Sequence, residues 1–202
     1  MKVGVVSDTH LPRFGDRLPE RLRRGLGAER VELILHLGDF TGREVPAFLE
    51  TLAPLEEVAG NNDPPALVRR FGRRKVVTLD GVRVGMVHGD GTRSTTAGRS
   101  VRAFEDDGVD VICFGHSHRA ICERRDGIWL VQSRVTDGQA DTGSLLLRDP
   151  RCPGGPRRAA ARVLRSRGVR VVGWPVSAPR DGRGPPPGRV RCSTRRPGAA
   201  TW

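Results

Sequence analysis

The feature that most constrains this chain is the way its short apolar segments end. The run from Val3 to Val6 stops at Ser7, and Asp8 and His10 follow directly. A short apolar run bounded by polar residues is typical of a buried strand. Because open α/β sheets bind ligands at the carboxyl ends of their strands, Asp8 and His10 are expected where such a fold would place a site.

The segments that follow alternate between helix and strand patterns. Leu18, Leu22 and Leu26 recur at helical spacing, and Gly27 follows them as a stop signal. Further strands are expected at residues 31–37, 55–59, 76–79, 82–87, 109–114, 120–123, 128–131 and 144–147, and further helices at 45–52, 64–70 and 97–104. Asp80-Gly81 predicts a two-residue hairpin turn between two of the strands. This alternation predicts an α/β fold.

Five of the expected strands end in a potential metal ligand. These residues are Asp8 with His10, Asp39, Asn61, His88, and His116 with His118. Taken singly, each is better explained as a turn or helix-cap residue than as a ligand. Taken together, they converge if parallel strands bring their ends to one edge, and mixed nitrogen and oxygen ligands suit divalent metals. Seven ligands exceed one tetrahedral site and fit two metals that share a bridging carboxylate.

The order of these motifs carries a family resemblance. Asp-x-His, Gly-Asp, Gly-Asn-x-Asp, His-Gly and Gly-His-x-His together resemble the calcineurin-like metallophosphoesterase superfamily over residues 1–147. The short spacing resembles its small prokaryotic, YfcE-like phosphodiesterase branch. The resemblance implies a two-sheet α/β sandwich with flanking helices. It implies one metal held by Asp8, His10 and His118, a second held by Asn61, His88 and His116, and Asp39 as the bridge.

The resemblance also implies a reaction. A dinuclear metal-dependent phosphoesterase of this kind, most often a phosphodiesterase, attacks a small phosphodiester with a metal-activated water and needs no side-chain nucleophile. Asp39, Asn61 and Asn62 are the residues expected to take part. Two divalent ions are expected, with Mn²⁺ preferred and Ni²⁺, Fe²⁺, Zn²⁺ or Mg²⁺ as alternatives. The histidine-rich ligand set argues against Mg²⁺ as the preferred ion.

Three positions depart from the family pattern. Asn62 stands where many members have a histidine that assists the leaving group, and a carboxamide cannot donate a proton as an acid. We therefore expect a preference for good leaving groups. Residues 131–134, Val-Gln-Ser-Arg, replace the Asn-Pro-Gly-Ser turn of the branch, and Asp90 stands where histidine is commoner.

Several other polar residues lie close to these motifs in the sequence. His36 is expected in the core or in support of a ligand rather than as a ligand. Thr9, Asp63 and Ser117 are expected either to orient ligands or to fill turn and cap roles. Arg119 is expected at the solvated surface, with phosphate contact as the alternative, and Cys113 in the apolar core.

Composition separates the last quarter of the chain from the rest. The net charge of +12 comes entirely from residues 148–202, which contain 14 arginines and two aspartates. Proline and glycine make up 17 of those 55 residues, which predicts a disordered basic tail with at most a short element within 163–172. Either a genuine basic arm or out-of-frame translation of GC-rich DNA explains this composition.

The remaining sequence features limit location and partners. The four cysteines lack metal-ligand spacing, the chain enters a strand at once, and no apolar run approaches 18 residues. We therefore expect reduced thiols, a cytoplasmic location and no membrane span. One alternative function is a non-catalytic interaction module on the same fold, which resembles a retromer scaffold subunit. Another is nonspecific nucleic-acid contact by the arginine-rich tail. The oligomeric state is left open.

Overall fold

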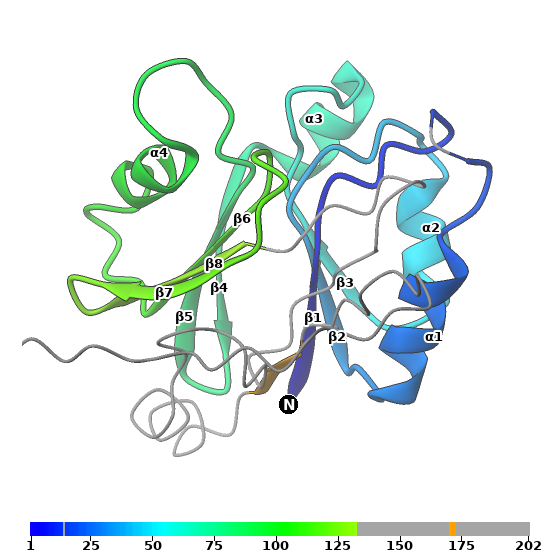
Figure 1. The fold of residues 1–202 in the computed structure, drawn as a ribbon, viewed down its shortest axis with the longest axis horizontal. Coiled ribbons are helices and arrows are strands. Elements are labelled where there is room, and N and C mark those ends of the chain that lie inside the picture. Colours follow the sequence, from blue (N-terminus) through cyan, green and yellow to red (C-terminus); the bar gives the residue numbers. More distant parts are fainter. Residues whose placement is uncertain (14, 133–169, 173–202) are drawn as a thin grey trace, which may run out of the picture.

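Two β-sheets packed face to face, with helices on their outer faces, form the part of the chain that the structure describes (Figure 1). This computed structural model describes residues 1–13, 15–132 and 170–172. The first sheet has the order β3-β2-β1-β9 and is parallel throughout, with β1 Lys2–Val6, β2 Leu33–His36, β3 Leu55–Glu57 and β9 Arg170–Val172.

The second sheet is mixed and has the order β4-β5-β6-β8-β7. Its strands are β4 Arg74–Leu79, β5 Val82–Val87, β6 Val111–Phe114, β7 Ile121–Arg125 and β8 Ile128–Gln132. The predicted Asp80-Gly81 turn joins the antiparallel pair β4 and β5, while β5, β6 and β8 run parallel. The predicted two-sheet α/β sandwich is confirmed.

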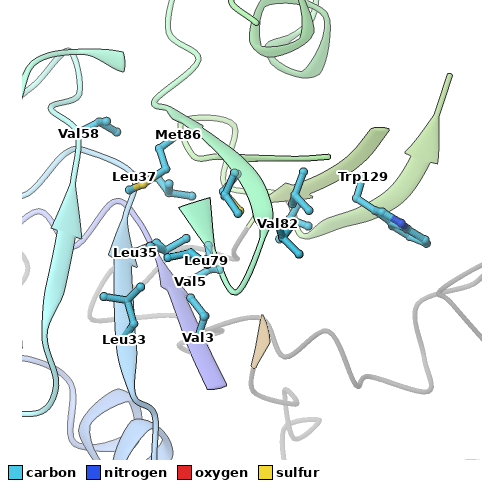
Figure 2. Close-up of a cluster of buried hydrophobic side chains, with 14 residues drawn as sticks. Val3, Val5, Leu33, Leu35, Leu37, Val58, Leu79, Val82, Met86 and Trp129 are labelled. Atoms are coloured by element: carbon cyan, nitrogen blue, oxygen red, sulfur yellow. The ribbon is translucent and has the colours of Figure 1, made fainter. Parts of the chain in front are cut away.

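A cluster of 14 buried side chains fills the space between the sheets (Figure 2). Val3 and Val5 of β1 enter it from one sheet, and Val111 and Cys113 of β6 enter it from the other. Side chains of a strand alternate between its two faces, so the intervening residues belong to the outer clusters. The expected core position of Cys113, which is 0% exposed, is confirmed.

Four helices flank the sandwich within the described residues. They are α1 Glu20–Ala28, α2 Val45–Glu50, α3 Pro65–Phe71 and α4 Thr96–Arg102. Leu22 and Leu26 of α1 pack with Ile34 on the outer face of the first sheet, and Ala97 of α4 packs with Ile112 on the second (Figure 1). None of these helices combines the length and apolarity needed to cross a bilayer.

Most element boundaries differ from the expected ones by one to three residues, because pairing with neighbours decides where a strand ends. β4 starts at Arg74 rather than Val76, since Arg74 pairs with Val87 across the hairpin. The expected strand at 144–147 lies outside the described residues, as does most of the tail. The exception is β9, whose three residues pair with Lys2–Gly4 and lie within the range 163–172, where a short element was expected. This pairing satisfies backbone groups on the edge of β1.

Candidate metal centre

The carboxyl ends of β1, β2, β5 and β6 bring most of the predicted ligands together. Nε2 of His118 lies 3.5 Å from Oδ1 of Asp8, and Nε2 of His88 lies 3.9 Å from the same oxygen. Nε2 of His88 also lies 3.3 Å from Oδ2 of Asp39. Two groups result, each with ligand atoms within 4.8 Å of one another: Asp8, His10 and His118, and Asp8, Asp39 and His88.

The two carboxylates lie between the two groups of imidazoles. Asp8 belongs to both groups. Oδ2 of Asp39 lies 3.3 Å from Nε2 of His88 and 3.7 Å from Nε2 of His10, so this carboxylate faces one histidine from each predicted metal. The arrangement is compatible with the predicted bridge at Asp39, and it gives Asp8 an equally central place.

His116 lies outside these two groups, which consist of aspartates and histidines. Asn61 is exposed. The ring of His116 lies 5.1 Å from that of His88, and its backbone N–H donates to Oδ2 of Asp8 at 3.1 Å. The structure therefore brings together all three residues of the first predicted ligand set, with His88 of the second beside them.

Asn62 lies on the carboxylate of Asp39. Its backbone N–H donates to Oδ1 at 2.8 Å, and its side-chain Nδ2 donates to Oδ2 at 2.6 Å. The position that holds a histidine in many family members is thus occupied by a side chain that fixes a candidate ligand.

The backbone at the site is unusual. Ten non-glycine residues of the described chain have positive φ, and five of these ten are predicted ligands. They are Asp8 (55°), His10 (46°), Asp39 (60°), His116 (70°) and His118 (57°). Such conformations are unfavourable for residues with a Cβ and cluster at functional sites. Their concentration at the strand ends supports a functional role for this part of the fold.

The surroundings of His88 test whether a cation fits here. Its Nδ1 lies 2.7 Å from the carbonyl oxygen of Leu37, which can only accept, so Nδ1 holds a proton. The opposite nitrogen, Nε2, is buried and has no well-formed hydrogen bond among the described residues, yet it faces the carboxylates of Asp8 and Asp39. In a neutral imidazole this nitrogen presents a lone pair to two anions, an arrangement that a cation between them would stabilise. The residues present therefore fit a divalent metal.

The charges of the site are consistent with this fit. Burial opposes ionisation of Asp39, but the nearby imidazole of His88, together with the two hydrogen bonds from Asn62, holds its pKa well below the usual range. Burial also lowers the pKa of His10, which favours the neutral imidazole that a metal requires. Burial works against protonation of His88, yet the nearby carboxylates of Asp39 and Asp8 raise its pKa. The site attracts positive charge.

Asp63 holds the loops that follow β2 and β3. Its carboxylate accepts from the backbone N–H groups of Asp39 at 2.9 Å, Gly60 at 2.8 Å and Thr41 at 2.8 Å. A Cβ at Gly60 would lie only 2.2 Å from Oδ1 of Asp39, so a glycine is required at this close approach. Of the two roles expected for Asp63, the structure favours orienting a ligand.

His36 supports the site from the core, as expected. Nδ1 accepts from the N–H of Gly38 at 3.3 Å, and Nε2 lies 3.3 Å from the hydroxyl of Thr9. Burial lowers the pKa of His36 to about 3, so the ring is neutral at physiological pH. Arg119, as expected, is exposed.

Gln132 is a contributor that sequence analysis missed. Its Oε1 accepts from the hydroxyl of Ser117, between the two histidines of the Gly-His-x-His motif, at 2.8 Å. Gln132 is fully buried at the carboxyl end of β8. The strand-end rule that selected the ligands would also have selected this residue.

The family follows from a comparison with known proteins. The family model for the calcineurin-like phosphoesterase superfamily domain matches residues 1–135. The chain belongs to this family. A probable metallophosphoesterase of Methanothermobacter thermautotrophicus is 38% identical over 124 residues, which are 59% of this chain and 67% of that protein. A phosphodiesterase of Methanocaldococcus jannaschii is 26% identical over 146 residues, 65% of this chain and 81% of that one.

Solved structures of the same fold include a protein described as a phosphodiesterase and proteins described as Vps29. A novel archaeal phosphodiesterase has a TM-score of 0.55 and 23% identity, and the match covers 71% of this chain and 92% of that one. Vps29 of Chaetomium thermophilum has a TM-score of 0.62 and 22% identity, covering 70% and 78%. At these identities the likeness shows the fold alone. Membership of the family supports a metal-dependent hydrolase in general.

Proposed function

We propose that this chain is a dinuclear metal-dependent phosphodiesterase that hydrolyses small phosphodiesters. The single observation that supports this most directly is the lone-pair position of His88 Nε2 against the carboxylates of Asp8 and Asp39. The phosphodiesterase named among its relatives supports the reaction class.

Two sets of residues would hold the metals. Asp8, His10 and His118 form the first set, Asn61, His88 and His116 the second, and Asp39 lies between them. When bound, two divalent cations would lower the pKa of water and neutralise charge on the phosphoryl oxygens. Mn²⁺ is the preferred ion because imidazole nitrogens and carboxylate oxygens together suit a borderline divalent metal.

Asn62 restricts which leaving groups the site can release. Asn62 donates both of its N–H contacts to Asp39 and has no acidic proton to transfer. The leaving group must therefore depart as a stable anion or take its proton from solvent. This limitation favours diesters with good leaving groups, such as aryl esters.

The experiment that tests the proposal is hydrolysis of bis(p-nitrophenyl) phosphate by chelator-stripped protein, with and without Mn²⁺. We expect turnover only with added metal. Asp39→Asn should remove that turnover, whereas Asp106→Asn, at an exposed aspartate, should retain it. Absence of turnover with every divalent metal tried, in protein shown to be folded, would refute the proposal and favour a non-catalytic interaction module.

A further inference from the structure

A basic run at residues 69–75 leads from α3 into β4 beside the candidate metal centre. Three of its members have acidic partners, in the pairs Arg70–Glu50, Arg74–Asp107 and Lys75–Glu56. Arg73 differs from these three. Among the described residues its guanidinium has no carboxylate partner, and its Nη1 donates to the carbonyl oxygen of Gly60 at 3.1 Å.

The turn between α3 and β4 explains why Arg73 lies there. Gly72 ends α3 with a φ of 70°, and its carbonyl oxygen accepts from the N–H of Ala59 at 2.7 Å. This bond fixes the turn against the end of β3. Gly60 in turn contacts Asp39 so closely that a Cβ would lie 2.2 Å from Oδ1. Gly60 therefore contacts the guanidinium of Arg73 through its carbonyl oxygen and lies against Asp39 of the candidate centre.

The chemistry of this position suits an anion. A guanidinium that is held by a neutral carbonyl keeps its full positive charge, and several of its N–H donors remain for a further acceptor. Arg73, Asn61 and Asn62 are all exposed, so a solute can reach this side of the site. The planar N–H fork of arginine matches the oxygens of a phosphoryl group.

We propose that Arg73 binds a second phosphoryl group of the substrate, next to the one that is cleaved. The inference rests on the proposed function and narrows its substrate class to small, nucleotide-like phosphodiesters that have such a second group. A substrate without it would lose the contact with Arg73.

A pair of substrates that differ only in the second group tests this inference. They are the p-nitrophenyl ester of thymidine 5′-phosphate and the same ester with a 3′-phosphate. For the wild type we expect the 3′-phosphate to lower KM about tenfold, the lower end for a charge-assisted bond because the site is exposed. In Arg73→Gln the two esters should have equal KM values.

The matched control is Arg69→Gln. Arg69 is exposed on α3 in the same basic run, and it has no partner among the described residues. This variant removes the same charge and should keep the KM ratio of the wild type. Equal ratios in the wild type and in Arg73→Gln would overturn the inference, as would a ratio lost in both variants, since that would indicate a general charge effect.

A binding measurement separates this inference from the proposed function. Calorimetric titration of the Mn²⁺-loaded protein with thymidine 3′,5′-bisphosphate and with thymidine 5′-monophosphate needs no turnover. We expect the bisphosphate to bind about tenfold more tightly to the wild type, and equally to Arg73→Gln. Binding that follows this pattern without hydrolysis of either ester would refute the proposed function alone. Hydrolysis of both esters with equal KM values, together with equal binding of the bisphosphate and the monophosphate, would refute the inference alone.

Discussion

The imidazole of His88 lies 3.3 Å from the carboxylate of Asp39, although the two residues follow strands of different sheets. Asp39 follows β2 of the first sheet, and His88 follows β5 of the second. The approach shows that the two sheets end at the same level, so a single carboxylate contacts ligands from both. Substitutions at these two positions should therefore lower metal binding more broadly than a substitution at an exposed ligand such as His118.

The metal content of two variants tests which residue is shared. Asp39→Asn should lower the bound metal at both sites and reduce kcat/KM at least about 100-fold, because even residues that only support a ligand contribute about 10–100-fold. His118→Ala should lower only the site it shares with Asp8 and His10. Metal content by plasma mass spectrometry checks both. Equal losses in the two variants would contradict the assignment of Asp39 as the bridge.

Restoring an acid at position 62 tests the leaving-group limitation. Asn62→His replaces a side chain that donates to Asp39 with one that can protonate a departing oxygen. We expect hydrolysis of an alkyl phosphodiester to rise about tenfold, below the usual range for a positioned acid because the site is built around a carboxamide. The measurement is kcat/KM for an alkyl and an aryl diester. An unchanged alkyl rate would mean that protonation of the leaving group does not limit turnover.

Asp63 should be important for stability as well as for the site. Asp63→Ala leaves the N–H groups of Asp39, Thr41 and Gly60 without their acceptor, which should cost about 3 kcal/mol of unfolding free energy. Urea denaturation of the metal-free protein measures this. Asp106→Ala, at an exposed position, is the control and should change stability little. A cost in Asp63→Ala no larger than the control's would show that water replaces the carboxylate.

Glu57 should make stability depend on pH. Burial raises its pKa above the ordinary 4.5, despite the opposing charge of Lys75, whose Nζ lies 4.0 Å away. The folded state therefore binds the proton more tightly than the unfolded state. The contribution of Glu57 to the free energy of unfolding is fully present below pH 4.5, and it is lost as the pH rises through the pKa that Glu57 has in the folded state. Glu57→Gln should match the wild type in acid and exceed it at neutral pH, measured by urea denaturation at each pH. A variant less stable than the wild type at neutral pH would contradict this.

The parts of the fold that were predictable are those governed by repeating patterns. Short apolar runs mark the central strands, which are buried on both faces, and parallel pairing of neighbours such as β1 with β2 brings their carboxyl ends together. Asp8 and Asp39 were therefore identifiable as neighbours from the sequence, whereas the approach of His88 depends on how the second sheet packs on the first. The loops beyond the strands follow no such pattern. The exposure of Asn61 and the orientation of His116 depend on individual left-handed residues and on bonds such as Ser117 to Gln132.

The division of the ligands between the two sheets has a mechanical consequence. Asp8 and Asp39 extend from the first sheet and His88 from the second, so a bound cation would act as a cross-link across the sandwich. Without it, these strands are held together at this end by side-chain packing and by a few hydrogen bonds, such as those from His88 to Leu37 and from His116 to Asp8. The lifetime of the native state would then follow the release rate of the ion, because the layers could separate only after this cross-link is broken.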